Sequence, residues 1–216
     1  MEADDPTPQA APPSPDAPPS PDAPPSPAAP RPPDAPPPLP PEAALVHAFL
    51  NTLDRRSFVR RGAPHRGGDR IATRGQLADW LAGHGLLPPG TAVDGPTLDR
   101  VHLLRARLRA AVGGSTAPPP DAGDPLRLTF ALNAPADRAP ALAPAGRAGE
   151  RALGELVLHT LRAVTSGSWE RLKMCQAPDC HWVFYDRSRP NRARWCAPEL
   201  CGNRMKTRAY RRRARG

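Results

Sequence analysis

Cysteine is missing from residues 1–174 of this 216-residue chain, and all four cysteines lie between positions 175 and 201. Also missing is any stretch near the roughly 18 apolar residues that a membrane-spanning helix requires. The N-terminus opens with an acidic run, whereas a secretory signal is basic and then apolar. We therefore expect a cytoplasmic protein without a membrane-spanning helix, whose thiols stay reduced.

The sequence also lacks a recognisable catalytic constellation. Apart from His181, which follows Cys180, the histidines occur singly, and no two of them are spaced to bind a metal. No serine or cysteine nucleophile has an evident partner base. We therefore expect that the protein is not an enzyme. The single histidines are His47, His65, His84, His102 and His159.

Residues 1–41 contain 19 of the 33 prolines and almost no side chain that a core could bury. The sequence Ala-Pro-Pro-Ser-Pro-Asp occurs at 11–16 and 17–22, and with one change at 23–28. This composition favours an extended polyproline II arm, which we interpret as a disordered spacer with a net charge of −5. Its Pro-x-x-Pro sequences are also compatible with docking into an SH3-like groove.

Residues 42–166 are long enough to form one modest core. Apolar residues recur at helical spacing in 42–54, in a short segment that starts at Leu77, in 97–112 and in 149–164. Thr73 and Gln76 have the spacing of a capping box. Residues 126–132 alternate and predict a strand. The side chains expected to face the core are Leu45, Phe49, Leu53, Leu77, Trp80, Leu81, Leu98, Val101, Leu104, Leu108, Val112, Leu153, Leu156, Val157 and Leu161.

The four cysteines form two pairs with equal gaps, Cys175-x4-Cys180 and Cys196-x4-Cys201, with 181–195 between them. Such pairs predict a tetrahedral site of four thiolates, which leaves no coordination position open and is therefore structural. A module of this size needs a metal because it cannot bury enough apolar surface. We expect one Zn²⁺. Iron is the alternative, although iron sites of this kind usually have tighter cysteine gaps.

The excess positive charge of the whole chain lies in the same region. From Trp169 to Gly216 there are 13 Lys and Arg against 4 Asp and Glu, while residues 1–168 hold 17 of each. Residues 181–185 suit a strand of a hairpin, and the pattern of 203–215 predicts a helix with Asn203 as its N-cap. Together the two regions predict an α+β fold: a mainly helical N-terminal domain with a small sheet, followed by a four-cysteine finger made of a hairpin and a basic helix.

Polyanions are the natural partners of this surface, with nucleic acid first. Four arginines of the last helix recur at spacings of four, three and four, within about 60° of one face and along about 17 Å of axis. Such a helix fits a nucleic-acid groove. The predicted nucleic-acid-binding residues are Arg187, Arg189, Arg192, Arg194, Arg204, Lys206, Arg208, Arg211, Arg212, Arg213 and Arg215.

The last cysteine, Cys201, begins a literal Cys-Gly-Asn-Arg string, and the spacings on both sides of it match a known pattern. This region resembles the CGNR zinc finger. Residues 49–55 are similar to the opening signature of the ABATE domain that usually precedes this finger. The resemblance covers most of 42–213, and Pro190 departs from the family pattern. The finger's other matching segments are Lys173-x-Cys175, Asp179-Cys180, Phe184 to Arg189, Arg194 to Cys196 and Lys206.

The resemblance implies an arm at 1–41, an ABATE-like domain at 42–166 and a finger at 167–216, with the four cysteines as zinc ligands. It also implies a bacterial, stress-induced transcription regulator that binds DNA through the finger. The N-terminal domain would sense a small-molecule ligand or mediate dimerisation, and its signature makes Asn51, Asp54 and Arg55 candidates for that role. Helix capping and core hydrogen bonds explain these three residues as well.

Two other functions remain open at this point. The charge pattern suits RNA as well as DNA, and the sequence does not separate the two. A zinc-stapled module that binds an acidic protein partner is the third hypothesis.

Overall fold

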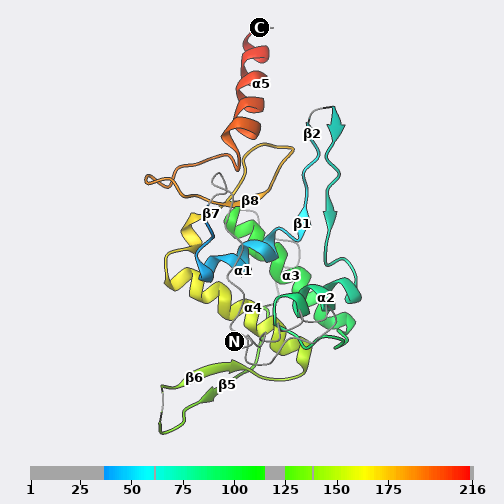
Figure 1. The fold of residues 1–216 in the computed structure, drawn as a ribbon, viewed down its shortest axis with the longest axis vertical. Coiled ribbons are helices and arrows are strands. Elements are labelled where there is room, and N and C mark those ends of the chain that lie inside the picture. The colour runs from blue at the N-terminus through cyan, green and yellow to red at the C-terminus, as the bar shows by residue number, and fades with distance from the viewer. Residues whose placement is uncertain (1–36, 61, 115–124, 138, 215–216) are drawn as a thin grey trace, which may run out of the picture. The chain divides into compact units, whose positions relative to one another are not determined.

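The computed structural model describes residues 37–60, 62–114, 125–137 and 139–214, with the side chain of Arg60 left out. Its architecture is α+β, with α-helices and small two-stranded antiparallel sheets, as the sequence predicts (Figure 1). Residues 1–36, which hold most of the proline-rich arm, lie outside the described part. Contacts group residues 38–216 into one unit, so the helical region and the cysteine-rich region pack together.

The first helix, α1 (Pro41–Leu50), begins with proline at its first position, where the missing N–H costs nothing. The predicted helix over 42–54 is wrong at its C-terminal end. Thr52 donates its hydroxyl hydrogen to the carbonyl of Phe49, and the chain then extends into β1 (Leu53–Asp54). β1 pairs with β4 (Gly68–Asp69). The side chain of Thr52 therefore ends the helix by forming a hydrogen bond with the backbone of the last turn.

The next two helices begin at sequence-encoded caps. The capping box of Thr73 and Gln76 is confirmed at the start of α2 (Arg74–Gly83). Asp94 accepts a hydrogen bond from the Thr97 N–H at the start of α3 (Gly95–Val112). Between α1 and α2, a narrow hairpin consists of β2 (Val59–Arg60) and β3 (Ala63–Pro64).

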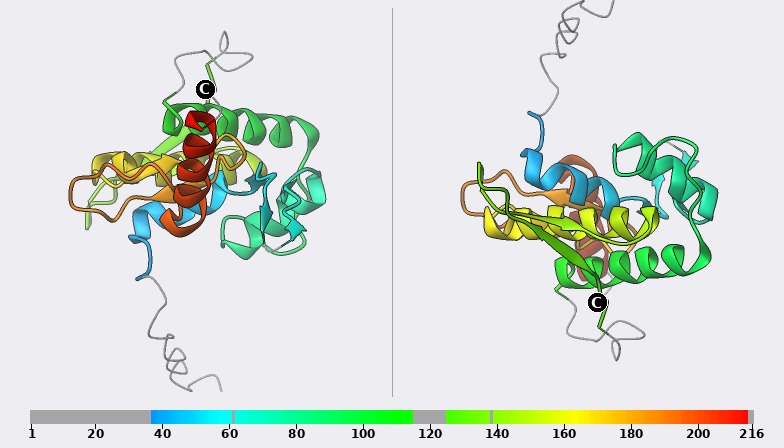
Figure 2. Two further views of the ribbon diagram at one scale, coloured as in Figure 1. Left: turned by 90° about the horizontal axis from the view of Figure 1, so that it is seen from above. Right: turned by 90° about the horizontal axis from the view of Figure 1, so that it is seen from below.

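The predicted strand over 126–132 is confirmed only at its C-terminal end, since β5 covers Phe130–Asn133 and residues 126–129 are outside it; its partner is β6 (Ala141–Pro144). The sequence pattern did not identify β6, because alanine and proline are weak strand formers. β6 leads into α4 (Ala148–Thr165), which packs against α1 and α3 (Figure 2). Gly154 of α4 permits close packing of this helix against β6, since a Cβ there would lie 2.4 Å from Pro144.

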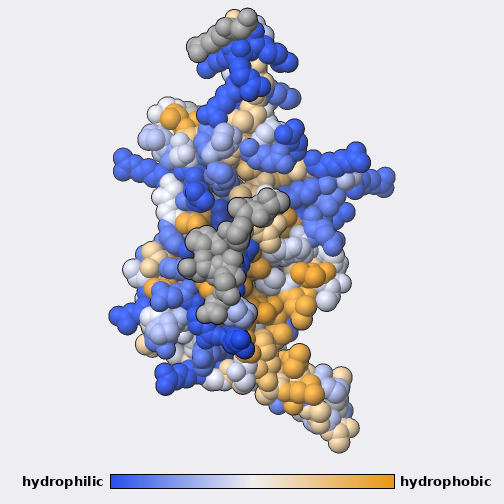
Figure 3. Space-filling model, turned by 180° about the vertical axis from the view of Figure 1, so that it is seen from behind, coloured by the Kyte–Doolittle hydropathy of each residue, from blue (hydrophilic) through white to orange (hydrophobic). Residues whose placement is uncertain are grey.

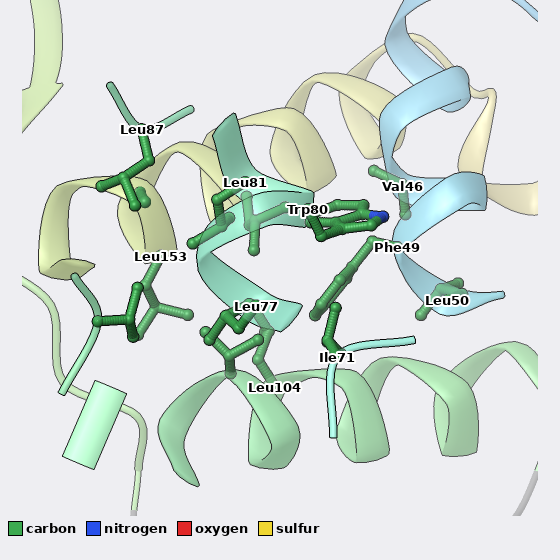
Figure 4. Packing of buried hydrophobic residues seen from close by; sticks show 14 of the residues in the cluster. Val46, Phe49, Leu50, Ile71, Leu77, Trp80, Leu81, Leu87, Leu104 and Leu153 are labelled. Atoms are coloured by element: carbon green, nitrogen blue, oxygen red, sulfur yellow. The ribbon is translucent and has the colours of Figure 1, made fainter. Parts of the chain in front are cut away.

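One apolar core joins the helices. Phe49 of α1 and Trp80 of α2 meet with ring centroids 5.8 Å apart, among leucines of α2, α3 and α4 (Figure 4). The core continues into the cysteine-rich region through Leu172 and Val183. The prediction that Leu161 faces inward is wrong, because its side chain is 52% exposed. α4 packs along the neighbouring positions Leu153 and Leu156 instead.

The cysteine-rich region begins with β7 (Leu172–Met174), which pairs with β8 (Val183–Tyr185). A π-helical turn, Pro198–Gly202, leads directly into α5 (Asn203–Arg213). Asn203 is therefore not the N-cap, and that prediction is wrong. Its backbone is helical, and its side-chain amide donates to the carbonyl of Glu199 in the preceding turn.

Hydrophilic and apolar side chains gather on different elements of the surface. Hydrophilic side chains cover α5, whereas apolar side chains gather over the β5–β6 hairpin (Figure 3). Leu132 and Leu142 are paired across this hairpin and are 67% and 54% exposed. Within the described ranges, none of the helices combines the length and apolar character that crossing a membrane demands.

Candidate metal centre and basic surface

The four cysteine sulfur atoms converge on one point. Their Sγ atoms all lie within 4.8 Å of one another, although 181–195 separate the two pairs along the chain. The Sγ atom of Cys196 is 3.7 Å from that of Cys180 and 3.6 Å from that of Cys201. Sulfur atoms at the corners of a tetrahedron with Zn–S bonds of ~2.3 Å are about 3.8 Å apart. The cluster therefore fits one structural zinc ion bound by Cys175, Cys180, Cys196 and Cys201.

Backbone hydrogen bonds place each thiol. The Cys175 N–H donates to the carbonyl of Trp182, and the Cys180 N–H closes a tight turn onto Ala177. His181 then reverses the chain into β8 with a φ of 54°. Its ring contacts the carbonyl of Pro178, so it does not replace a thiolate ligand.

The pKa values of the thiols show why the cluster needs a cation to hold all four cysteines as thiolates. A hydrogen bond from the Cys180 thiol, with a second from Cys196, lowers the pKa of Cys175 to about 2. The same bonds to Cys175 raise the pKa of Cys180 and of Cys196. Four thiolates in so small a space repel one another unless a cation lies between them. Bound zinc supplies that charge.

Arg204 belongs to the structure of this centre. Its guanidinium bonds to the carboxylate of Asp179 at 2.5 Å and to the Cys201 sulfur at 3.4 Å. Its Cζ atom also lies 4.1 Å from the centroid of the Phe58 ring. Of the predicted nucleic-acid-binding residues, Arg204 is thus the one most fully engaged within the protein. The next arginine on this face, Arg208, also reaches Asp179, at 3.4 Å, but is 58% exposed.

A buried carboxylate organises the basic loop before the second cysteine pair. Asp186 accepts hydrogen bonds from the N–H and hydroxyl of Ser188, from the Ala193 N–H and from the Lys173 ammonium. Burial opposes ionisation, but these hydrogen bonds, with that of Ser188 the strongest, hold its pKa well below the usual range. The loop also carries the four predicted arginines Arg187, Arg189, Arg192 and Arg194, all of which are exposed.

The remaining basic residues lie on α5. Lys206 and Arg208 are exposed, as are the three consecutive arginines that follow Tyr210. No acidic residue lies between Gly202 and Gly216. Arg215 lies outside the described residues. The exposed basic residues that the structure brings onto this helix are Lys206, Arg208, Arg211, Arg212 and Arg213.

Comparison with family models gives two matches. The ABATE model, described as Putative stress-induced transcription regulator, matches residues 43–172, and the CGNR zinc finger model matches residues 171–214. The first match covers more than half of the chain. The protein belongs to the ABATE family. No curated protein matches the sequence.

The ABATE signature holds the CGNR finger in place. The side-chain amide of Asn51 donates to the carbonyl of Val183 at 2.8 Å and accepts from its N–H at 3.0 Å. Arg109 of α3, 6% exposed, donates to the carbonyls of Leu50 and His181. Burial lowers the pKa of Arg109 to about 10, so it stays charged at neutral pH. Sequence reasoning overlooked Arg109, because an arginine on an amphipathic helix normally faces solvent.

The other signature residues serve the hairpin that follows. Asp54 pairs with Arg56 at 2.7 Å and with His65 at 2.8 Å, across the base of the β2–β3 hairpin. The Arg56 guanidinium lies 4.0 Å from the Trp182 ring centroid of the CGNR finger. Arg55 is exposed. These contacts give Asn51 and Asp54 structural roles, and the ligand predicted for the ABATE domain stays a prediction.

Proposed function

We propose that the protein is a DNA-binding transcription regulator whose CGNR finger contacts the DNA. The single observation that carries this proposal is the exposed basic face of α5, which starts two positions after the zinc ligand Cys201. The metal therefore sets the position and direction of the helix. Phosphate groups would neutralise its side chains and supply most of the affinity.

Within this proposal, the partners and exposure of the basic side chains divide them between two roles. Arg204 is held by Asp179, so we assign it to positioning α5. Lys206, Arg212 and Arg213 are exposed, and we assign them to phosphate contacts. The loop arginines of 187–194 extend this surface. Since four thiolates close the zinc site to substrate, the proposal includes no catalysis.

Binding of a random-sequence DNA duplex to the zinc-loaded full chain, measured by fluorescence anisotropy across a salt series, tests the proposal. We expect binding that weakens steeply with salt and is lost with a zinc chelator. A triple variant, Lys206→Ala with Arg212→Ala and Arg213→Ala, should lower the slope of log K against log salt by about 2 to 3. The matched control replaces three arginines elsewhere, Arg74, Arg127 and Arg162, with alanine.

Four results would contradict the proposal. Binding that survives chelation, or equal losses in the two triple variants, would show that the finger is not the contact. Tighter binding of an RNA duplex at moderate salt would favour the RNA-binding function. A partner retained in nuclease-treated pull-downs, with no nucleic-acid binding by the purified chain, would favour the protein-interaction module.

A further inference from the structure

A groove with a volume of about 660 Å³ lies between α5 and the β2–β3 hairpin of the ABATE domain. Three arginines of α5, Arg204, Arg208 and Arg211, line one side, and Val59 of β2 lies on the other. The apolar side chain of Leu200 and the carboxylate of Glu199 also line the groove. The hairpin and α5 project in the same direction from the helical core (Figure 1).

The hairpin is anchored to the finger at its base. Phe58 is 6% exposed and packs among the buried cysteines, beneath the Arg204 guanidinium. The neighbouring Ser57 N–H donates to the carbonyl of Asp179. Because side chains alternate along a strand, burial of Phe58 turns Val59 outward, where it is 61% exposed. The zinc centre therefore sets the position of both walls of the groove.

Positive charge lies on the α5 wall, and the chain segment that contains Val59 is itself rich in arginine. The segment 55–70 contains six arginines and one aspartate, and among the described side chains Arg55, Arg66 and Arg70 are exposed. On the α5 side, Asp179 pairs with both Arg204 and Arg208 and thus offsets only part of their charge. Two basic elements held next to each other repel, unless an anion lies between them.

We propose that the β2–β3 hairpin is a second nucleic-acid-binding element, and that a phosphodiester strand lies in the groove between Val59 and α5. The proposal rests on the proposed function and extends it from the finger to the ABATE domain. Arg208 and Arg211 contact phosphates from the α5 side, and the arginine-rich segment 55–70 adds to the positive potential of the surface. Val59 and Leu200 provide apolar contacts for the sugars.

Charge reversal at Val59 tests the proposal in the full zinc-loaded chain, with the same DNA duplex as probe. Val59→Glu places a carboxylate in the groove and should weaken binding about three- to tenfold. Val59→Lys should bind at least as tightly as the wild type. Glu199→Gln removes the native carboxylate and should tighten binding. The matched control is Leu132→Glu, a similarly exposed position on β5, which should change affinity less than about twofold.

Zinc content and thermal midpoint of each variant should match the wild type, since the substituted side chains are exposed. Equal affinity of Val59→Glu and wild type, in a protein that loses binding in the Lys206/Arg212/Arg213 variant, would overturn the hairpin's role and leave the finger's role intact. Equal losses with Glu and Lys at position 59 would overturn it too, since the effect would then be independent of charge. Absence of any nucleic-acid binding by the wild type would overturn both proposals.

Discussion

At the scale of single residues, Asn51 joins two segments that are 132 positions apart in the chain. Its side-chain amide forms hydrogen bonds with both the N–H and the carbonyl of Val183, as the backbone of a neighbouring strand would. Val183 is fully buried, so no water can replace the amide. A single side chain therefore satisfies two buried backbone groups at the contact between the ABATE domain and the finger.

Replacing Asn51 with alanine should remove both hydrogen bonds that its side chain makes with the backbone of Val183. We expect a loss of about 2–4 kcal/mol in the free energy of unfolding, or roughly 4–15 °C in the thermal midpoint. Differential scanning calorimetry of the zinc-loaded chain measures it. Asn133→Ala, at an exposed position of β5, is the control. An unchanged midpoint for the Asn51 variant would contradict the assigned role.

Asp186 makes a second prediction at this scale, one that depends on pH. Its pKa is lower in the folded protein than in the unfolded chain, so its contribution to stability is complete above about pH 4. That contribution disappears as the pH falls through the lowered folded-state pKa. Asp186→Asn should therefore cost about 2–3 kcal/mol at pH 7.

The stability difference between wild type and Asp186→Asn should narrow only below about pH 4. Urea unfolding at several pH values, with zinc content checked at each, measures this difference. Asp99→Asn, exposed on α3, should change stability little at any pH. A difference that narrows already between pH 7 and pH 5 would show that the Asp186 carboxylate is not held by these hydrogen bonds.

At the scale of elements, the finger depends on metal while the helices share an apolar core. β7 and β8 have three residues each, and the large apolar side chains around the cysteine cluster other than Phe58, such as Trp182 and Trp195, are only partly buried. A two-stranded hairpin of this length is marginal without further support. By contrast, α1 to α4 pack around Phe49, Trp80 and the leucines beside them.

Removing zinc should therefore unfold the finger and release the β2–β3 hairpin, with much of the helical core retained. Hydrogen exchange followed by peptide mass spectrometry measures this by region. With chelator, peptides from 54–66 and 172–202 should lose protection, while those from α3 and α4 keep it. Protection of 54–66 that does not change on chelation would contradict the anchoring of the hairpin by Phe58.

At the scale of the whole molecule, the distribution of charge is less simple than a basic tail on a neutral chain. The segment 1–168 sums to zero only because the arm's net charge of −5 offsets an excess in 42–168. That region holds 16 arginines against 11 Asp and Glu. The segment 55–70 contains the largest part of this excess, and its hairpin lies beside α5.

Deleting residues 1–41 raises the net charge of the chain from +9 to +14. We expect DNA binding at low salt to tighten about two- to fivefold, with the gain disappearing at high salt because exposed charges are screened. A chain whose six acidic residues in the arm are replaced by amides should behave like the deletion. A gain in the deletion variant alone would point to the bulk of the arm rather than its charge.

Local chemistry was sufficient for much of this protein. The cysteine spacing predicted the zinc ligands, Thr73 and Gln76 predicted a helix start, and the periodicity of apolar residues located α3 and α4. Each of these features is determined by residues that lie within a few positions of one another in the chain, because a helical turn or one pair of metal-binding cysteines spans only that distance.

The tertiary structure alone decided which polar residues are engaged within the protein and which face solvent. Arg204 and Arg208 belong to one arginine stripe, yet Asp179 and Phe58 hold the first while the second remains mostly exposed. Segments far along the chain supply the partners of Asn51, of Arg109 and of the segment that contains the β2–β3 hairpin. Such contacts follow from how the elements pack, and no short-range periodicity records that packing.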